Sequence, residues 1–143
     1  MPMDNDWLSH FLRLVGDLVL AVVLGGIIGL QREYERKAAG LRTHMLVSLG
    51  AALFVLSARE LGMRVEDISR VIQGVAAGIG FLGAGTILKL APERQIKGLT
   101  TAAGIWLTAA IGVAAGAGLV LLATLATLAA LVVLAIMSRF EII

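Results

Sequence analysis

Two oppositely charged side chains, Arg13 and Asp17, stand within an apolar stretch that is otherwise suited to cross a membrane. An ionised carboxylate is costly in hydrocarbon and usually faces the interior of a helix bundle. Because four positions separate the two residues, we expect an ion pair on one helix face, with a proton or cation route as the alternative. Three further polar residues are candidates for an intramembrane site with Asp17: Arg70, Gln73 and Thr108.

Two short segments ahead of apolar stretches could bind an anion through free backbone N–H groups. Arg42-Thr43 and Thr100-Thr101 stand at expected helix starts, where the helix dipole favours negative charge. A threonine at such a position serves first of all as an N-cap. The alternative is a site for a lipid headgroup or another anion, to which Arg32 and Lys97 would contribute.

Other classes of chemistry have little support in the sequence. There is no cysteine, which excludes disulfides and thiol nucleophiles, and the motifs G-x-S-x-G and H-E-x-x-H are absent. We therefore expect neither an enzyme nor a cofactor. We interpret Glu33 and Glu35 as solvated loop charges and expect no metal site, because with His44 they lack a ligand spacing typical of metals. A net charge of +2 does not favour nucleic acid.

The elements that position these residues must be membrane-spanning helices. The chain is 59% hydrophobic and 15% charged, a composition typical of membrane proteins. Between Lys97 and Arg139 lie 41 residues without a charge, with Gly116-Ala117-Gly118 among them. Because a helix crosses the hydrocarbon with about 20 residues, this stretch predicts two crossings joined by a tight turn.

We predict an all-α transmembrane bundle that forms one domain over residues 1–143. The first apolar segment lacks the cationic start of a signal peptide, so we expect it to be retained as a span. The five expected helices cover about 11–30, 43–61, 71–88, 99–115 and 119–137.

The distribution of basic residues predicts the orientation. They concentrate in the connections after the first and third spans and in the C-terminal tail. Since basic residues accumulate on the cytoplasmic side, we expect the N-terminus outside and the C-terminus in the cytoplasm. The residues on the predicted cytoplasmic side are Arg32, Arg36, Lys37, Arg42, Lys89, Arg94, Lys97 and Arg139.

Glycine patterns predict where the helices approach closely, since association in lipid depends on packing at small residues. Small residues on two faces of the span at 71–88 predict a central helix. The span at 99–115 has its own stripe, with Trp106 pointing away. We interpret these faces as packing surfaces of the bundle or of a homodimer, and a polar path along the Gln73 and Thr108 faces is the alternative. The predicted packing residues are Gly25, Gly29, Gly74, Gly78, Gly80, Gly83, Gly85, Gly104 and Gly112.

Several of these motifs, in this order, resemble the MgtC/SapB family of bacterial inner-membrane proteins from about Leu12 to Gly118. The matching motifs are Gly25-Gly26-Ile27-Ile28-Gly29-Leu30-Gln31-Arg32-Glu33, Gly40-Leu41-Arg42-Thr43, Arg70, Gly78-Ile79-Gly80-Phe81-Leu82-Gly83-Ala84-Gly85, and Gly98-Leu99-Thr100-Thr101-Ala102-Ala103 with Trp106.

The resemblance implies a multi-pass domain in the bacterial cytoplasmic membrane. Family members are associated with growth under magnesium limitation and with intracellular survival of pathogens, and look more like regulators of other membrane machines, including the ATP synthase, than Mg²⁺ carriers. Two departures stand out. Gln31 occupies a position where the family usually has glutamate, and the chain ends at Ile143 without the soluble C-terminal domain that many members carry.

Three functions compete on this basis. The first is a non-enzymatic regulator that contacts a second copy, with a dimer favoured, and a larger membrane complex through its helices. The second is a small transporter or channel for Mg²⁺, protons or phosphate, lined by Asp17, Arg70, Gln73 and the hydroxyl groups of the span at 99–115. The third is sensing of membrane lipids or anions at the Arg42 and Thr100 turns.

Overall fold

In the computed structural model, which describes residues 6–90 and 95–140, the chain folds into five helices and one β-hairpin. The helices are α1 (Asp6–Tyr34), α2 (Leu41–Glu60), α3 (Val65–Gly85), α4 (Leu99–Gly116) and α5 (Val120–Phe140), and the strands are β1 (Leu88–Leu90) and β2 (Gln95–Lys97). All five helices are long and apolar enough to cross a membrane, which confirms the predicted transmembrane helical class.

The hairpin between α3 and α4 was not expected. β1 and β2 pair antiparallel, with Leu88 opposite Lys97 and Leu90 opposite Gln95. The predicted third span, 71–88, therefore ends earlier than expected, at Gly85, and begins earlier, at Val65. The alternation of apolar and polar residues in Leu88-Lys89-Leu90 has the period of a strand and not of a helix, which is the physical reason for the difference.

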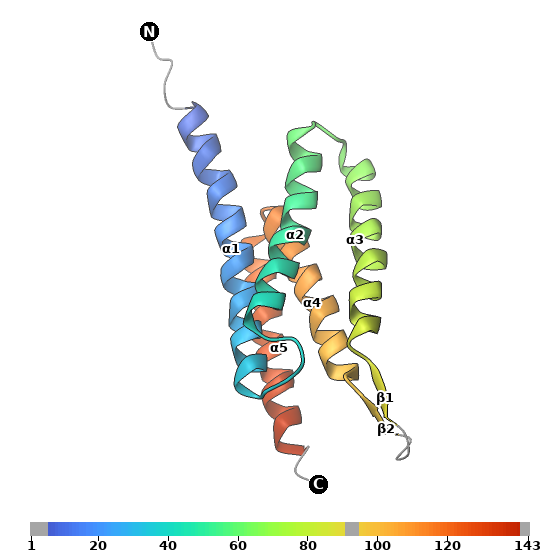
Figure 1. Cartoon of the computed structure of the whole chain (residues 1–143). Helices are drawn as coiled ribbons and strands as arrows, with labels where there is room; N and C mark the ends of the chain where they lie inside the picture. The colour runs from blue at the N-terminus through green and yellow to red at the C-terminus, as the bar shows by residue number, and fades with distance from the viewer. Residues whose placement is uncertain (1–5, 91–94, 141–143) are drawn as a thin grey trace.

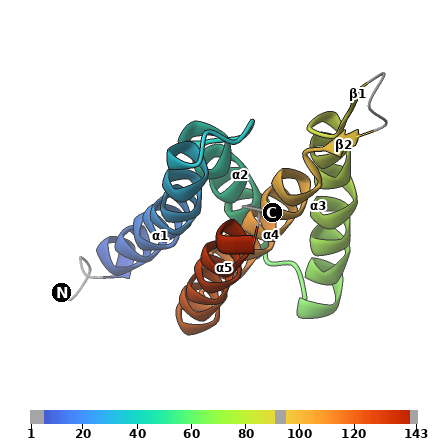
Figure 2. The same ribbon diagram turned by 90° about the horizontal axis from the view of Figure 1, so that it is seen from below.

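The central element of the bundle is α4, which contacts α1, α2, α3 and α5. Figure 2 shows α4 between the α1–α2 pair and α3. Helix α5 packs against α4 and α1. Ten residues of α4 are buried, whereas Gly83 is the one buried residue of α3. The prediction that the span at 71–88 is the central helix is therefore wrong: α3 lies at the edge of the bundle, against α4 and α2 (Figure 1).

The end of α1, the start of α2, the β-hairpin, the start of α4 and the end of α5 lie at one end of the bundle (Figure 1). Most of the basic residues that predicted the orientation belong to this end, and Arg94 lies outside the described residues. Its cytoplasmic location stays a prediction.

Candidate functional site

Four polar side chains are almost completely buried on the three helices that pack around the centre of the bundle. Arg32 of α1 is 2% exposed, and His44 and Ser48 of α2 and Thr108 of α4 are 0% exposed. We call these residues the polar cluster. They begin at the basic end of the bundle, where α1 ends and α2 starts.

Glycines of α1 bring its backbone directly onto the α2 part of the cluster. A Cβ atom at Gly25 would lie 2.6 Å from the carbonyl oxygen of His44 and 2.6 Å from the Ser48 Cβ. A Cβ atom at Gly29 would lie 2.9 Å from the His44 Cβ and 2.8 Å from the Leu41 Cα. Because any side chain would collide there, these two predicted packing glycines set the spacing between α1 and α2.

Glycines of α4 meet the same α2 residues. Gly112 packs against the backbone of Ser48, and a Cβ atom at Gly104 would lie 3.6 Å from the His44 Nε2. Thr108 stands one helical turn from each of these glycines. Its hydroxyl is therefore on the face of α4 that is turned toward His44 and Ser48.

Only some polar atoms of this region make hydrogen bonds. The His44 Nδ1–H donates to the Gly40 carbonyl oxygen at 2.9 Å, so the neutral ring has its lone pair on Nε2. The Arg32 Nη1 donates to the Glu35 Oε2 at 3.2 Å, and the Gln31 Nε2 donates to the other carboxylate oxygen at 2.6 Å. Glu35 is thus held by two residues of the last turns of α1.

The remaining polar atoms of the cluster have no partner. Within the part of the chain that the structure describes, the buried atoms without a hydrogen bond are Gln31 Oε1, Arg32 Nε and Nη2, His44 Nε2, Ser48 Oγ and Thr108 Oγ1. Each such atom costs about 1–3 kcal/mol when nothing satisfies it, and native proteins contain few of them. Their concentration around one helix junction makes the cluster the most unusual chemical feature of the molecule.

Glu33 organises the turn that leads into the cluster. Its Oε2 accepts a hydrogen bond from the Leu41 backbone N–H at 2.7 Å, and a Cβ atom at Gly40 would lie 2.6 Å from the same oxygen. The interpretation of Glu33 and Glu35 as solvated loop charges holds only in part: Glu33 is exposed but belongs to α1, and Glu35 follows α1 but is only partly exposed. The reason is that α1 continues to Tyr34, so that these carboxylates face the start of α2 and the Arg32 side chain.

The N-caps of α2 and α4 are glycines, Gly40 and Gly98, so neither N-cap residue supplies a side-chain hydrogen bond. The N-cap interpretation of the threonines is therefore wrong, because both helices begin at the leucine that precedes them. The two predicted anion segments also differ from each other. Arg42-Thr43 is exposed, whereas Thr101 is buried against the bundle.

At the other end of the bundle, Asp17 pairs with Arg59 of α2 and not with Arg13. The Arg59 Nη1 lies 3.4 Å from the Asp17 Oδ2 and donates a 2.7 Å hydrogen bond to the Gly116 carbonyl oxygen. Arg13 is exposed on α1. The expected Arg13–Asp17 pair is therefore corrected: α1 packs along α2, and this brings the last turn of α2 next to Asp17.

The other residues predicted for the Asp17 site lie elsewhere. Arg70 and Gln73 are exposed on α3, and Thr108 belongs to the polar cluster. The structure therefore separates the predicted intramembrane set into three places. Among the described residues there is no group of three or more His, Cys, Asp or Glu residues that could hold a metal ion.

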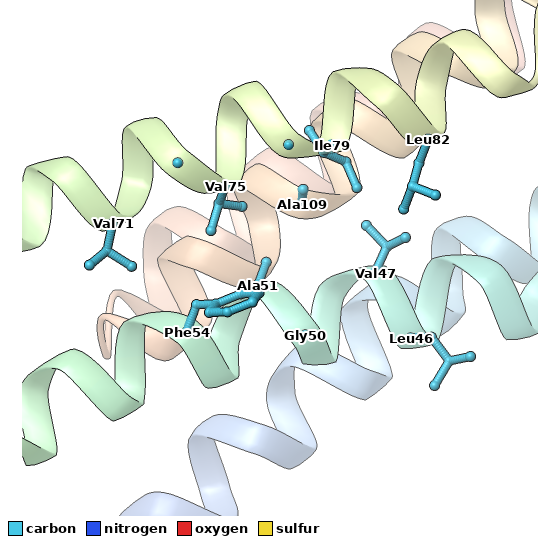
Figure 3. Close-up of a pocket in the computed structure, with 12 residues that line it drawn as sticks. Leu46, Val47, Gly50, Ala51, Phe54, Val71, Val75, Ile79, Leu82 and Ala109 are labelled. Atoms are coloured by element: carbon cyan, nitrogen blue, oxygen red, sulfur yellow. The ribbon is translucent and has the colours of Figure 1, made fainter.

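An apolar groove of about 610 Å³ separates α2 from α3. Figure 3 shows Val71, Val75 and Leu82 of α3 pointing toward α2, whose Phe54 projects into the same space. Both the α2 wall and the α3 wall of the groove include glycines at which a Cβ atom would meet nothing within 4 Å. The residues that line the groove are Leu46, Val47, Gly50, Ala51, Phe54, Val71, Gly74, Val75, Gly78, Ile79, Leu82 and Ala109.

The predicted packing glycines of α3 are mostly unpartnered. A Cβ atom at Gly74, Gly78, Gly80 or Gly85 would meet nothing within 4 Å, and only Gly83 contacts α4, through Ala102. Gly74 and Gly78 belong to the groove. Apart from Gly83, these α3 glycines therefore make no close contact within the chain, and their alternative role as the packing surface of a homodimer stays a prediction.

Sequence reasoning missed His44 and Ser48. The signal was present, because the two residues are four positions apart and therefore share one face of a helix. The small residues Gly25 and Gly29 indicated a close approach by a neighbouring helix, but nothing in the sequence assigned that approach to the His44 face.

Comparison with known proteins shows that the sequence matches a known family. The profile of the MgtC family matches residues 18–142. Protein SrpB of Synechococcus elongatus is 44% identical over 127 residues, which cover 81% of this chain and 68% of SrpB. The protein of Escherichia coli K12 named "Putative magnesium transporter YhiD" is 46% identical over 112 residues, which cover 71% of this chain and 50% of YhiD.

Protein MgtC of Brucella abortus strain 2308 is 46% identical over 100 residues, which cover 70% of this chain and 41% of that protein. The chain therefore matches half or less of the length of YhiD and of the Brucella protein. No solved structure matches it.

Proposed function

We propose that this chain, which belongs to the MgtC family, is a non-enzymatic regulator in the bacterial cytoplasmic membrane. It acts through helix–helix contacts with a second copy of itself and with a larger membrane complex such as the ATP synthase. Its physiological setting is growth or survival under low magnesium, as the family resemblance implies.

The groove between α2 and α3 carries this proposal. In lipid, helices associate where small residues allow backbones to approach, and an exposed small-residue face is unusual on a helix that has no partner. Gly50 on one wall and Gly74 and Gly78 on the other wall provide such faces. The groove is apolar, so a transmembrane helix is a fitting occupant, and the glycines would lie against its backbone.

A substitution at Gly78 tests the proposal. Gly78→Leu would fill the groove without a clash inside the chain, because no atom lies within 4 Å of the Cβ position. Gly16→Leu is the matched control, because Gly16 also has open space around its Cβ position but lies on α1, outside the groove. The measurements are co-purification with the ATP synthase from mild detergent and growth at limiting Mg²⁺.

We expect Gly78→Leu to lose both co-purification and growth while its helical content and yield stay unchanged, and Gly16→Leu to behave as the unmodified protein. Normal co-purification and growth of the Gly78→Leu variant would contradict the proposal. So would an equal defect in the Gly16→Leu variant, because the groove would then have no special role.

A small transporter is the second candidate, and the name of the relative YhiD is the observation that favours it. Flux of Mg²⁺, protons and phosphate into liposomes that contain the purified chain tests this candidate. Flux that Asp17→Asn abolishes would support transport, and absence of flux for all three ions would reject it.

A further inference from the structure

We propose that the polar cluster is a binding site for a small, protonated oxyanion of the hydrogen phosphate class. Both the free ion and the headgroup of an acidic lipid supply such a phosphate group, and the two sources share the same chemistry at the site. This inference is independent of the groove and goes beyond the proposed regulatory function.

The guanidinium of Arg32 indicates an anion. Glu35 takes only Nη1, and the buried Nε and Nη2 are without a partner in the described part of the chain. The N–H bonds of Nε and Nη2 form one edge of the planar group and point in parallel, which is the geometry that binds two oxygens of a phosphate or carboxylate. A cation would be repelled by this charge.

The other members of the cluster favour phosphate over a carboxylate or sulfate. The Ser48 and Thr108 hydroxyls can each donate a hydrogen bond to a further oxygen. The His44 Nδ1–H is already bound to the Gly40 carbonyl, so the neutral ring offers an acceptor at Nε2. Hydrogen phosphate carries acceptor oxygens and also an O–H donor, whereas sulfate has no such donor at neutral pH.

No side chain at position 104 of α4 covers the His44 Nε2. A Cβ atom at Gly104 would have the His44 Nε2 as its one neighbour within 4 Å, at 3.6 Å. The absence of a side chain at Gly104 therefore leaves the unpartnered nitrogen open on the α4 side. The surrounding end of the bundle carries exposed Arg36, Arg42 and Lys97, which favour the approach of an anion.

Titration calorimetry of the detergent-purified chain with inorganic phosphate measures the binding affinity and tests the inference. Gly104→Ala is the informative variant, because a 3.6 Å contact is ordinary packing and the methyl group takes the space beside Nε2. Gly83→Ala is the matched control, with a Cβ position also 3.6 Å from its nearest neighbour, Ala102, outside the cluster. We expect binding to weaken about tenfold in Gly104→Ala and to stay unchanged in Gly83→Ala.

Two charge variants complete the test. Arg32→Gln should abolish phosphate binding. Arg42→Gln removes the same charge from an exposed side chain at the same end of the bundle, and its phosphate affinity should stay within about twofold of that of the unmodified protein. If Arg32→Gln fails to fold, the comparison of Gly104→Ala with Gly83→Ala decides. Titration with a short-chain phosphatidic acid identifies the source, because tighter binding of the lipid than of inorganic phosphate assigns the site to a headgroup.

Several results would overturn the inference. The first is absence of binding for both phosphate and phosphatidic acid, which would leave buried water as the partner of these atoms. The second is sulfate binding as tightly as phosphate, which would contradict the acceptor role of His44. The third is unchanged affinity in Gly104→Ala.

Discussion

Gly112 of α4 packs directly against the backbone of Ser48 in α2, with no room for a Cβ atom between the two helices. Gly25 of α1 meets the same serine, with a Cβ position 2.6 Å from the Ser48 Cβ. Both contacts lie where the polar cluster is buried, and a methyl group at either glycine must push the helices apart.

Gly112→Ala should consequently lower the stability of the bundle by about 1–3 kcal/mol, the usual cost of overpacking a close contact. Gly16→Ala is the control, because its Cβ would meet no atom within 4 Å. Thermal unfolding in detergent measures the difference. Equal melting temperatures for the two variants would show that the close approach of α4 to α2 is not a constraint.

Replacing Gly98 or Gly62 distinguishes two causes of lost stability, backbone strain at positive φ and collision of the new Cβ atom. Both have positive φ, 93° and 71°, but a Cβ atom at Gly98 would collide with the Thr86 carbonyl oxygen, whereas one at Gly62 would meet nothing within 4 Å. Gly62→Ala should cost about 1–2 kcal/mol, from backbone strain alone. Gly98→Ala should cost clearly more, because Thr86 at the end of α3 must move away from the start of α4. Thermal unfolding in detergent compares the two variants, and similar losses of stability would contradict the close approach of Thr86 to the start of α4.

Glu33 should stabilise the start of α2. Its carboxylate accepts the Leu41 N–H, which has no partner within its own helix. Glu33→Ala should cost about 1 kcal/mol, as for the loss of other helix caps. It should also speed amide hydrogen exchange in the first turn of α2. Glu66→Ala removes an exposed carboxylate from the first turn of α3 and should leave exchange in α2 unaltered.

Arg59 should contribute more to the stability of the bundle than its partner Asp17. Its 2.7 Å hydrogen bond to the Gly116 carbonyl satisfies a C-terminal carbonyl of α4, whereas its ion pair with Asp17 is 3.4 Å long and the arginine is 41% exposed. Asp17→Asn should therefore lower stability by less than about 1 kcal/mol. Arg59→Met should lower the melting temperature further, and the reverse order would indicate that the ion pair dominates.

The helical class could be predicted from the sequence because hydrocarbon thickness fixes the length of an apolar helix. The position of each helix in the bundle could not. The glycines of α3 and α4 both indicate that another backbone can approach, but they do not say whether that backbone belongs to the same chain. Gly112 has its partner in α2, whereas Gly74 and Gly78 face an open groove.

The candidate site was predicted only in part. The sequence indicates Arg32 and Thr108 as polar candidates, but it does not assign His44 and Ser48 to the site. Their role depends on the rotation of α2 against Gly25 and Gly29, a tertiary contact that helical periodicity does not specify. Glu33 was misjudged because its function depends on α1 reaching Tyr34, beyond the expected end at residue 30.

We propose that the groove between α2 and α3 receives a transmembrane helix of another membrane complex. A photo-crosslinking amino acid at Phe54, which is 65% exposed and lines the groove, tests this claim directly in intact cells. The same probe at Val133 of α5, which is 58% exposed, is the control. We expect adducts with a subunit of the ATP synthase membrane sector from position 54 and none from position 133. Equal labelling from both positions, or labelling of lipid alone at position 54, would contradict it.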